Sequence, residues 1–258
     1  MKKIILALAC TVVSMGLVPP VAALAQGEQV VLPFPIVDPP TKEELELAPL
    51  LDLRNGGIST GAAQGTGPTQ GGLINGTLLP QTGDSFRASS SEKSRWGSGM
   101  MVSMIMNSAP LLALQYTGVT LRIGGIAQQT GGPYKPHKSH QNGLDADILF
   151  VGTDSYDSVL DSTGAVTERF DPEKNWAYWR MITAQKILVK GKPISAISMI
   201  LVDPRIKTFL EARVVEDSIP MDELDLQVMK LLRPTEGHDT HFHVRLRCSP
   251  HYTTCLER

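Results

Sequence analysis

The stretch that decides the fold is HDTHFHVRLRC, residues His238 to Cys248. From His241 onward polar and apolar side chains alternate, which is the period of a β-strand with one buried face. The apolar set is Phe242, Val244, Leu246 and Cys248, and the polar set is His241, His243, Arg245 and Arg247. His241 and His243 therefore share a face and lie about 7 Å apart along the strand. One of them can bind a metal ion while the other reaches a water molecule on that ion.

A second cluster lies far upstream in HKSHQNGLDAD, residues His137 to Asp147. From Leu144 the chain again alternates, with Asp145 and Asp147 on one face of a strand predicted for 144–150. Two carboxylates on one face repel each other unless a positive charge lies beside them, and a dication supplies that charge. Gly143 allows a sharp turn, by which His140 can fold back toward Asp147.

These two clusters hold five of the six histidines of the chain. Neutral imidazole is a common ligand of transition metals. Two histidines and one carboxylate leave one position of a zinc ion open for water, whereas structural zinc sites are usually closed by four residues. Such a zinc site activates water and polarises carbonyl groups, so the pattern predicts hydrolysis of an amide or ester. The alternative is an ordinary hydrogen-bonded polar cluster.

The two clusters also resemble those of a known family. His140-x2-Gly143-x3-Asp147, followed far downstream by His241-x-His243, is similar to the pattern of the LAS peptidases. The fuller resemblance is to the penicillin-insensitive murein endopeptidases, whose two signature blocks match 137–148 and 241–248. Weaker similarity lies at 95–97, 200–207 and 232–234, so that the resemblance covers about 85–255. Pro136 stands where the family has glycine, and Gly125 lies near the place of an acidic residue.

The resemblance implies a role for each matching residue. It implies one zinc ion per chain, with His140, Asp147 and His243 as its ligands. It implies His241 as the general base, and His137 and His238 as further active-site histidines that contact substrate or stabilise the oxyanion. The implied substrate is peptidoglycan, cut in its peptide cross-links between D-alanine and meso-diaminopimelate. The implied fold is α+β, with a small mixed, largely antiparallel sheet and flanking helices.

Several of these roles have simpler alternatives. His241 could orient the site by bonding a neighbouring carboxylate, and His137 and His238 could be ordinary loop histidines. Asp145 could orient a ligand ring, or it could be a solvated strand carboxylate. Arg245 could bind a substrate carboxylate or form a structural ion pair.

The order of elements along the chain favours α+β over a doubly wound sheet. We expect a buried helix at 98–109 ended by Pro110, a strand at 119–126, and a helix at 172–189 whose Trp176, Trp179 and Ile182 are core contacts. A strand at 196–202, helices at 204–212 and 221–232, and the strand at 241–248 complete the domain.

The 258 residues divide into three parts by composition. Residues 1–25 predict a cleaved signal peptide, because Lys2 and Lys3 precede a short apolar stretch and a small-x-small site at Ala23 to Ala25. Residues 26–83 are rich in Pro, Gly, Thr and Gln and predict an extension without a core. Residues 84–258 form the predicted zinc peptidase domain. The protein is therefore expected in the periplasm.

Charge and cysteine content fit an exported enzyme. The formal charge is −2, and loss of Lys2 and Lys3 with the signal would make it −4, without a basic run for nucleic acid. No later segment is apolar and long enough to span a membrane. After loss of Cys10 with the signal, Cys248 and Cys255 remain and predict a disulfide, with two free thiols or two metal ligands as the alternatives.

Three functions therefore remain open. The first is a murein endopeptidase. The second is a carboxypeptidase or dipeptidase of the same chemistry that releases D-alanine. The third is a zinc-binding wall module without turnover, which would not need a second histidine on the same strand face as the ligand.

Overall fold

The computed structural model describes residues 62–65, 70–250, 252, 254 and 255. The predicted signal peptide and the extension up to residue 61 lie outside these residues. Within the described part of the chain, no helix has both the length and the apolar character needed to cross a bilayer.

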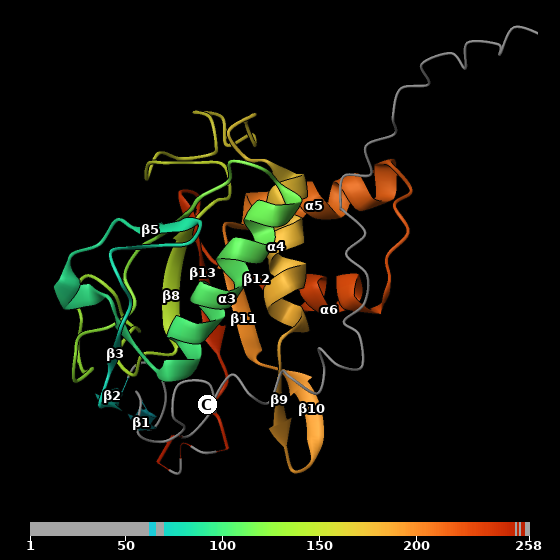
Figure 1. The fold of residues 1–258 in the computed structure, drawn as a ribbon. Coiled ribbons are helices and arrows are strands. Elements are labelled where there is room, and N and C mark those ends of the chain that lie inside the picture. Colours follow the sequence, from blue (N-terminus) through green and yellow to red (C-terminus); the bar gives the residue numbers. More distant parts are fainter. Residues whose placement is uncertain (1–61, 66–69, 251, 253, 256–258) are drawn as a thin grey trace, which may run out of the picture. The chain divides into compact units, whose positions relative to one another are not determined.

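A seven-stranded mixed sheet forms the centre of the fold, with strand order β12-β11-β13-β8-β7-β5-β4 (Figure 1). Its strands are β4 (Thr82–Gly83), β5 (Phe86–Ala88), β7 (Leu121–Ile123), β8 (Asp145–Leu149), β11 (Ile197–Val202), β12 (Leu232–Pro234) and β13 (His241–Leu246). The pairs β11–β12 and β5–β7 are parallel, and the other pairs are antiparallel. The predicted α+β fold with a largely antiparallel sheet is confirmed.

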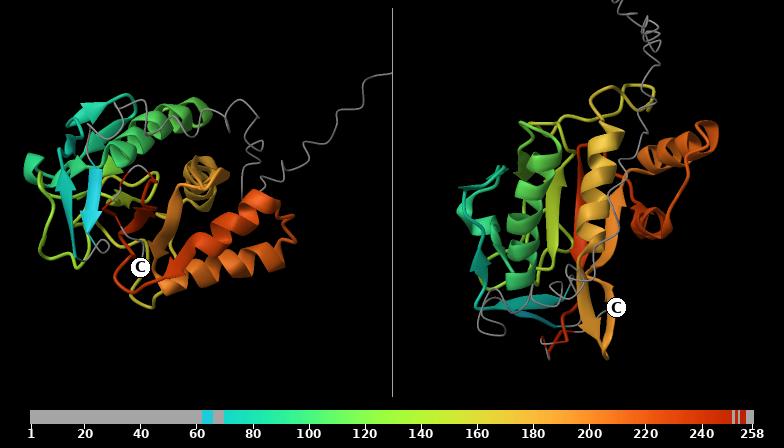
Figure 2. Two further views of the ribbon diagram at one scale, coloured as in Figure 1. Left: turned by 90° about the horizontal axis from the view of Figure 1, so that it is seen from below. Right: turned by 45° about the vertical axis from the view of Figure 1, so that its right-hand side comes forward.

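Helices pack against one face and one edge of this sheet. They are α3 (Gly99–Gln115), α4 (Pro172–Ala184), α5 (Pro204–Glu216) and α6 (Glu223–Leu231). α3 and α4 lie side by side in front of the sheet, whereas α5 and α6 lie beyond β11 and β12 (Figure 2). Trp179 packs edge to face on Phe242 of β13, with 5.7 Å between ring centroids. Trp176, Trp179 and Ile182 are fully buried, which confirms them as core contacts.

The helix predicted to end at Pro110 continues to Gln115. Ser98 begins α3 as predicted, because its side chain accepts the backbone N–H of Met101. Proline removes the N–H that would bond the carbonyl of Met106. Met106 is an exposed residue, so this lost bond lies on a hydrated side of the helix, where water can replace it.

The folded domain begins before residue 84. Residues assigned to the extension form β1 (Ala62–Gly65), β2 (Gly71–Ile74) and β3 (Thr77–Leu78), of which β3 pairs with β6 (Trp96–Gly97). Leu73 and Leu79 are buried here. Single apolar residues within a Gly- and Thr-rich stretch are enough to anchor it, although the composition alone predicts no core.

The helix predicted for 172–189 is longer than the helix observed there. α4 ends at Ala184, and β9 (Lys186–Val189) and β10 (Lys192–Ser195) form a hairpin that the sequence analysis missed. Its turn residues Lys190 and Gly191 both have positive φ, as a two-residue hairpin turn requires. The strand predicted for 119–126 is confined to β7.

A buried ion pair joins α4 to α6. Arg180 is 1% exposed, and its guanidinium donates to Asp222 and Asp225 at the start of α6. Trp176 Nε1 donates to Asp225 Oδ1 at 2.8 Å. Asp222 and Asp225 also form the capping box of α6, so one pair of carboxylates both begins the helix and binds it to its neighbour.

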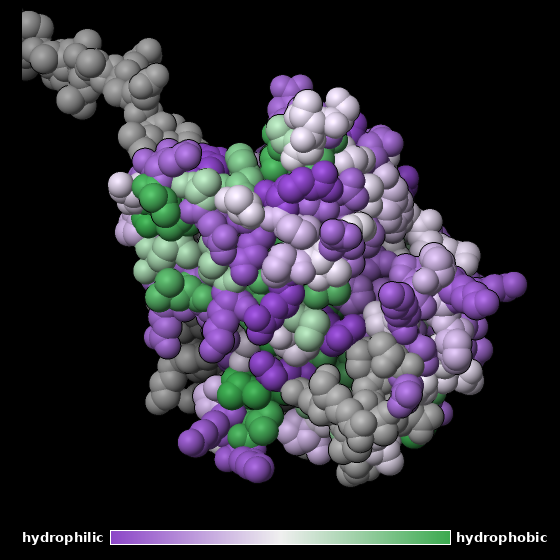
Figure 3. Space-filling model, turned by 180° about the vertical axis from the view of Figure 1, so that it is seen from behind, coloured by the Kyte–Doolittle hydropathy of each residue, from purple (hydrophilic) through white to green (hydrophobic). Residues whose placement is uncertain are grey.

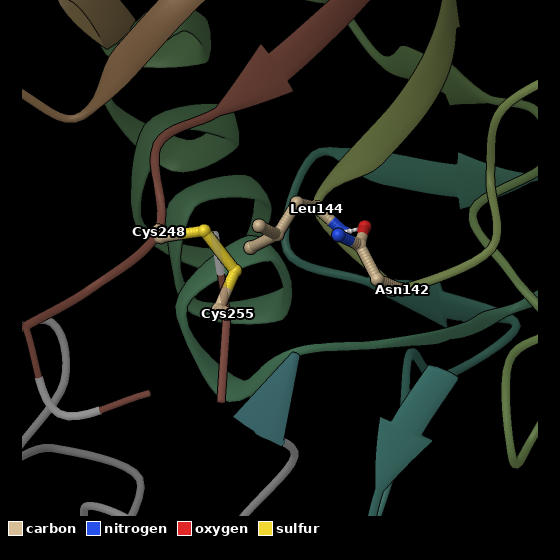
Figure 4. The surroundings of a disulfide bond; sticks show 4 residues. All are labelled: Asn142, Leu144, Cys248 and Cys255. Carbon is tan, nitrogen blue, oxygen red and sulfur yellow. Dashed lines mark hydrogen bonds between the residues drawn. A yellow bond between two sulfur atoms is a disulfide. The ribbon is translucent and has the colours of Figure 1, made fainter. Parts of the chain in front are cut away.

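The predicted disulfide between Cys248 and Cys255 is present. It lies beside Leu144, which directly precedes β8 (Figure 4). The backbone N–H of Leu246 donates to the carbonyl of Leu144 at 2.8 Å, so the disulfide follows the point where β13 meets the start of β8. It therefore braces the strand pair that carries Asp147 and His243.

Replacing both cysteines by serine is expected to lower the free energy of unfolding by about 2–3 kcal/mol, because the cross-link restricts a short loop of the unfolded chain. Urea denaturation of the oxidised protein and the double variant measures the difference. The reduced wild-type protein is the control and should resemble the variant. Equal midpoints for all three would contradict a stabilising role.

Candidate metal centre

Three side chains converge on one point on the sheet face opposite α3 and α4. His140 Nε2 lies 3.2 Å from Asp147 Oδ1, His243 Nδ1 lies 3.2 Å from the same oxygen, and the two nitrogens are 3.1 Å apart. Asp147 is in β8 and pairs directly with His243 in β13. His140 reaches them from the loop before β8.

Hydrogen bonds to the outer ring nitrogens fix both imidazole tautomers. His140 Nδ1 lies 2.7 Å from the carbonyl oxygen of Ile126, which can only accept, so Nδ1 carries the proton. His243 Nε2 lies 2.6 Å from Asp145 Oδ1 and donates to it in the same way. In the neutral rings His140 Nε2 and His243 Nδ1 are therefore lone-pair atoms, and both point toward Asp147 Oδ1.

The triangle formed by His140 Nε2, Asp147 Oδ1 and His243 Nδ1 fits a tetrahedral metal ion. Ligand atoms about 2.0–2.1 Å from zinc at tetrahedral angles are about 3.3 Å apart, close to the three observed distances. Asp147 is nearly fully buried, and its Oδ1 accepts no hydrogen bond within the described part of the chain. A buried carboxylate oxygen facing two lone pairs is costly unless a cation lies among them.

The backbone before β8 is shaped to bring His140 inward. His140 itself has a φ of 64°, in the left-handed region that few residues other than glycine adopt. Gly143 has a φ of 73°, and a Cβ there would lie 2.6 Å from the backbone nitrogen of Ser98. The predicted turn at Gly143 is therefore present, and the left-handed conformation of His140 adds to it.

Asp145 links the proposed ligand His243 to Arg245. Its Oδ1 accepts from His243 Nε2 and, at 2.7 Å, from Arg245 Nε. Asp145 is completely buried, so it is not a solvated strand carboxylate. Arg245 forms an ion pair with it, which is the structural alternative considered for this arginine. Such partners orient a ligating ring and raise its basicity.

The charges of this cluster favour a positive charge at its centre. Burial opposes protonation of His243, but the charges of Asp145 and Asp147 and the hydrogen bond to Asp145 outweigh it and raise the pKa of His243 to about 9. Burial likewise opposes ionisation of Asp147, yet His140 and His243 hold its pKa well below the usual value. A proton or a metal ion can supply the charge that these two carboxylates attract.

His241 lies beside the triangle, two residues before His243 on the same face of β13. Its Nε2 is 3.6 Å from Asp147 Oδ1, and its Nδ1 is 2.8 Å from the Thr240 hydroxyl. Burial lowers the pKa of His241 to about 4, so the ring is neutral at pH 7. The Tyr156 ring contacts it edge-on, with 5.8 Å between centroids. Sequence analysis did not identify Thr240 or Tyr156, because neither belongs to a recognisable motif.

His137 and His238 complete the group around Asp147. His137 Nδ1 lies 3.5 Å from Asp147 Oδ2, and its ring stacks on Tyr134 at 4.8 Å. The His238 ring is 5.3 Å from that of His241. Burial lowers the pKa of both histidines. All five clustered histidines of the sequence are thus brought together.

The two departures from the family signature lie beside these rings. A Cβ at Gly125 would come within 3.1 Å of the Tyr134 hydroxyl, so the absence of a side chain makes room for this tyrosine. Pro136 directly precedes His137, in the same loop as Tyr134. Tyr134 was also missed by the sequence analysis, and only its nearness to His137 in the sequence could have suggested it.

Two histidines compete as the third ligand beside His140 and Asp147. His137 offers a ligand atom within 4.8 Å of ligand atoms of both. His243 is nearer to both, and its outer nitrogen is bonded to a buried carboxylate, as is usual for ligating histidines. His137 has no such acceptor within the described residues and is more exposed. The geometry favours His243.

The fold and this site define a class: α+β proteins with a buried histidine–aspartate cluster, able to hold a metal ion, on the open face of a mixed sheet. Comparison with known proteins adds the family. Residues 65–258 match the family described as penicillin-insensitive murein endopeptidase, and the chain belongs to it.

Relatives of this name occur in several bacteria. The protein from Haemophilus influenzae is 28% identical over 192 residues, which cover 72% of this chain and 64% of that protein. The protein from Yersinia pestis bv. Antiqua is 24% identical over 209 residues, covering 73% of this chain and 69% of that one. The match thus spans slightly under two thirds of the Haemophilus protein.

Alanine variants separate the two candidate ligand sets. His140→Ala and His243→Ala should each reduce the zinc bound per chain to near zero, because each removes a vertex of the triangle, whereas His137→Ala should retain zinc. Atomic absorption after dialysis measures the content, and near-UV circular dichroism controls for folding. Zinc retained by His243→Ala but lost by His137→Ala would favour His137 as the third ligand.

Asp145→Asn should weaken zinc binding about 10- to 100-fold, because the amide no longer fixes the tautomer of His243. Competition with a chromogenic chelator measures the affinity. Asp157→Asn, an exposed carboxylate paired with Arg169, is the matched control and should bind zinc like the wild type. Unchanged affinity in Asp145→Asn would mean that this hydrogen bond does not hold the ligand ring.

Proposed function

We propose that the protein is a zinc-dependent endopeptidase that hydrolyses the D-alanine–meso-diaminopimelate cross-links of peptidoglycan. The observation that carries this proposal is the triangle of His140, Asp147 and His243, found in a chain that belongs to the murein endopeptidase family. Export to the periplasm by the segment 1–25 is part of the same proposal, because the substrate lies there.

In this proposal His140, Asp147 and His243 hold zinc, which supplies Lewis-acid activation of a water molecule and of the scissile carbonyl. Asp145 keeps the proton of His243 on Nε2, so that Nδ1 remains available as a ligand. Arg245 balances the charge of Asp145, which therefore stays ionised in its buried position.

His241 is the proposed general base. With its Nδ1 proton donated to the Thr240 hydroxyl, Nε2 keeps a lone pair on the side of Asp147. The low pKa of His241 keeps that lone pair free at neutral pH. The imidazole can then take the proton of the attacking water and return it to the leaving amine.

His137 and His238 are proposed to contact the substrate near the scissile bond. The Nδ1 of His238 lies 3.2 Å from the carbonyl of Thr235 and 3.3 Å from that of Glu236, so this nitrogen carries the proton of the neutral ring and Nε2 keeps its lone pair. His137 is partly exposed beside Asp147, where a carbonyl oxygen of a bound peptide can reach it.

The test is product analysis of a digested cell-wall preparation. Cross-linked muropeptides should be converted to monomers, a chelator should abolish cleavage, zinc should restore it, and a β-lactam should have no effect. Free D-alanine released from an uncross-linked pentapeptide would instead indicate a carboxypeptidase. Activity that survives exhaustive removal of zinc would refute the proposed chemistry.

His241→Ala should retain zinc but lower kcat/KM about 10²- to 10⁴-fold, the range typical of a lost general base. Zinc content and cleavage of a soluble muropeptide dimer are measured on the same sample. Thr163→Ala, in an exposed loop, is the control and should cleave normally. A different result would indicate a binding module. In that case the wild type and His241→Ala would both bind zinc and wall material, and neither would cleave the muropeptide dimer.

A further inference from the structure

Two arginines lie side by side on the sheet, away from the histidine cluster. β5 and β7 run parallel, and Arg87 pairs in register with Arg122. Like charges on neighbouring strands repel when they face each other directly. Neither guanidinium has an ion pair or hydrogen bond within the described part of the chain. The pair thus lacks a counter-charge from these residues.

The two arginines line a cavity of about 330 Å³. Thr82, Ser85 and Thr120 also line it and offer hydroxyl groups, and no acidic residue is among its lining residues. Guanidinium groups and hydroxyls are hydrogen-bond donors suited to the oxygens of an anion, and two arginines can bind one anion in a bidentate manner. The lining of this cavity therefore suits an anionic ligand.

Strand register relates the cavity to the proposed catalytic residues. Ile148 of β8 pairs with Ile123 of β7 and with Phe242 of β13, so β8 separates β7 from β13. A Cβ at Gly124 would lie 3.1 Å from Cβ of Asp147, so Gly124 and Arg122, two residues earlier, belong to the Asp147 side of the sheet.

Arg122 is therefore two strands, about 10 Å of backbone, from the strand of His241. Three extended peptide residues span that distance. The face in question lies opposite α3 and α4, and hydrophilic residues gather across its middle (Figure 3). A peptide cut at the histidine cluster is long enough to reach the arginine pair.

We propose that Arg87 and Arg122 bind a free carboxylate of a peptidoglycan peptide, remote from the bond that is cut. The identity of this ligand rests on the proposed function, whereas the anion site rests on the cavity itself. The pair adds affinity for the acidic wall polymer, and it does not touch the reacting atoms.

Binding to purified peptidoglycan sacculi tests the site. The full protein is mixed with sacculi in the presence of a chelator, so that nothing is cleaved, and the bound fraction is measured by sedimentation. Arg87→Gln with Arg122→Gln should bind about tenfold more weakly, as expected for lost charge-assisted hydrogen bonds. Lys192→Gln with Arg213→Gln removes the same charge elsewhere and should bind like the wild type.

Chemical amidation of the sacculi tests the ligand. The wild type should bind amidated sacculi about as weakly as the double variant binds untreated ones, and amidation should have little further effect on that variant. Equal binding of wild type and variant to untreated sacculi would overturn the site. An equal loss for both on amidation, or competition by inorganic phosphate but not by succinate, would overturn the carboxylate assignment.

Cleavage of a soluble cross-linked dimer separates this inference from the proposed function. The Arg87→Gln/Arg122→Gln variant should retain its zinc and show a KM raised more than kcat is lowered. Weaker binding without any cleavage by the wild type would leave the anion site standing and reject the endopeptidase. Cleavage by the wild type, with sacculus binding and KM unchanged in the variant, would reject the anion site and leave the endopeptidase standing.

Discussion

The architecture of the site follows from one constraint: the buried Asp147 Oδ1 must lie beside a positive charge. This oxygen is buried, lies 3.2 Å from a nitrogen of His140 and of His243, and accepts no hydrogen bond among the described residues. An isolated buried carboxylate is far more costly than the few kcal/mol by which a domain is stable. The surrounding architecture therefore makes sense as a means of holding two imidazole rings against this carboxylate and keeping a cation among them.

Three separate devices meet that demand. The β8–β13 register places His243 opposite Asp147, and a slip of one residue would turn either side chain to the helix-covered face. The left-handed turn at His140 and Gly143 brings the third side chain inward. The chain of contacts from Arg245 through Asp145 fixes the ring of His243. The register sets the positions of Asp147 and His243, the turn sets that of His140, and the contacts of Asp145 set the orientation of the His243 ring.

Much of this could be predicted from the sequence, because strand alternation has a simple period. The alternation after His241 and after Leu144 correctly gives β13 and β8 and the face that each histidine and aspartate occupies. Contacts that depend on the backbone of a distant segment carry no such signal. The carbonyl of Ile126 that binds His140 is one example, and the buried contacts of Arg180 with α6 are another. Local rules also failed where tertiary structure overrides them. Pro110 lies within α3 because its lost hydrogen bond is solvated, and Leu73 of β2 is buried although it lies in a Gly- and Thr-rich stretch.

The order of strands in the sheet has a consequence for biogenesis. Among the strands of the described residues β13 comes last, yet it occupies the middle of the sheet, between β11 and β8. The earlier strands of the sheet can emerge from the ribosome while this central position is still vacant. Two of the five clustered histidines, His241 and His243, are delivered with β13, so the triangle around Asp147 can close only after this strand has been synthesised.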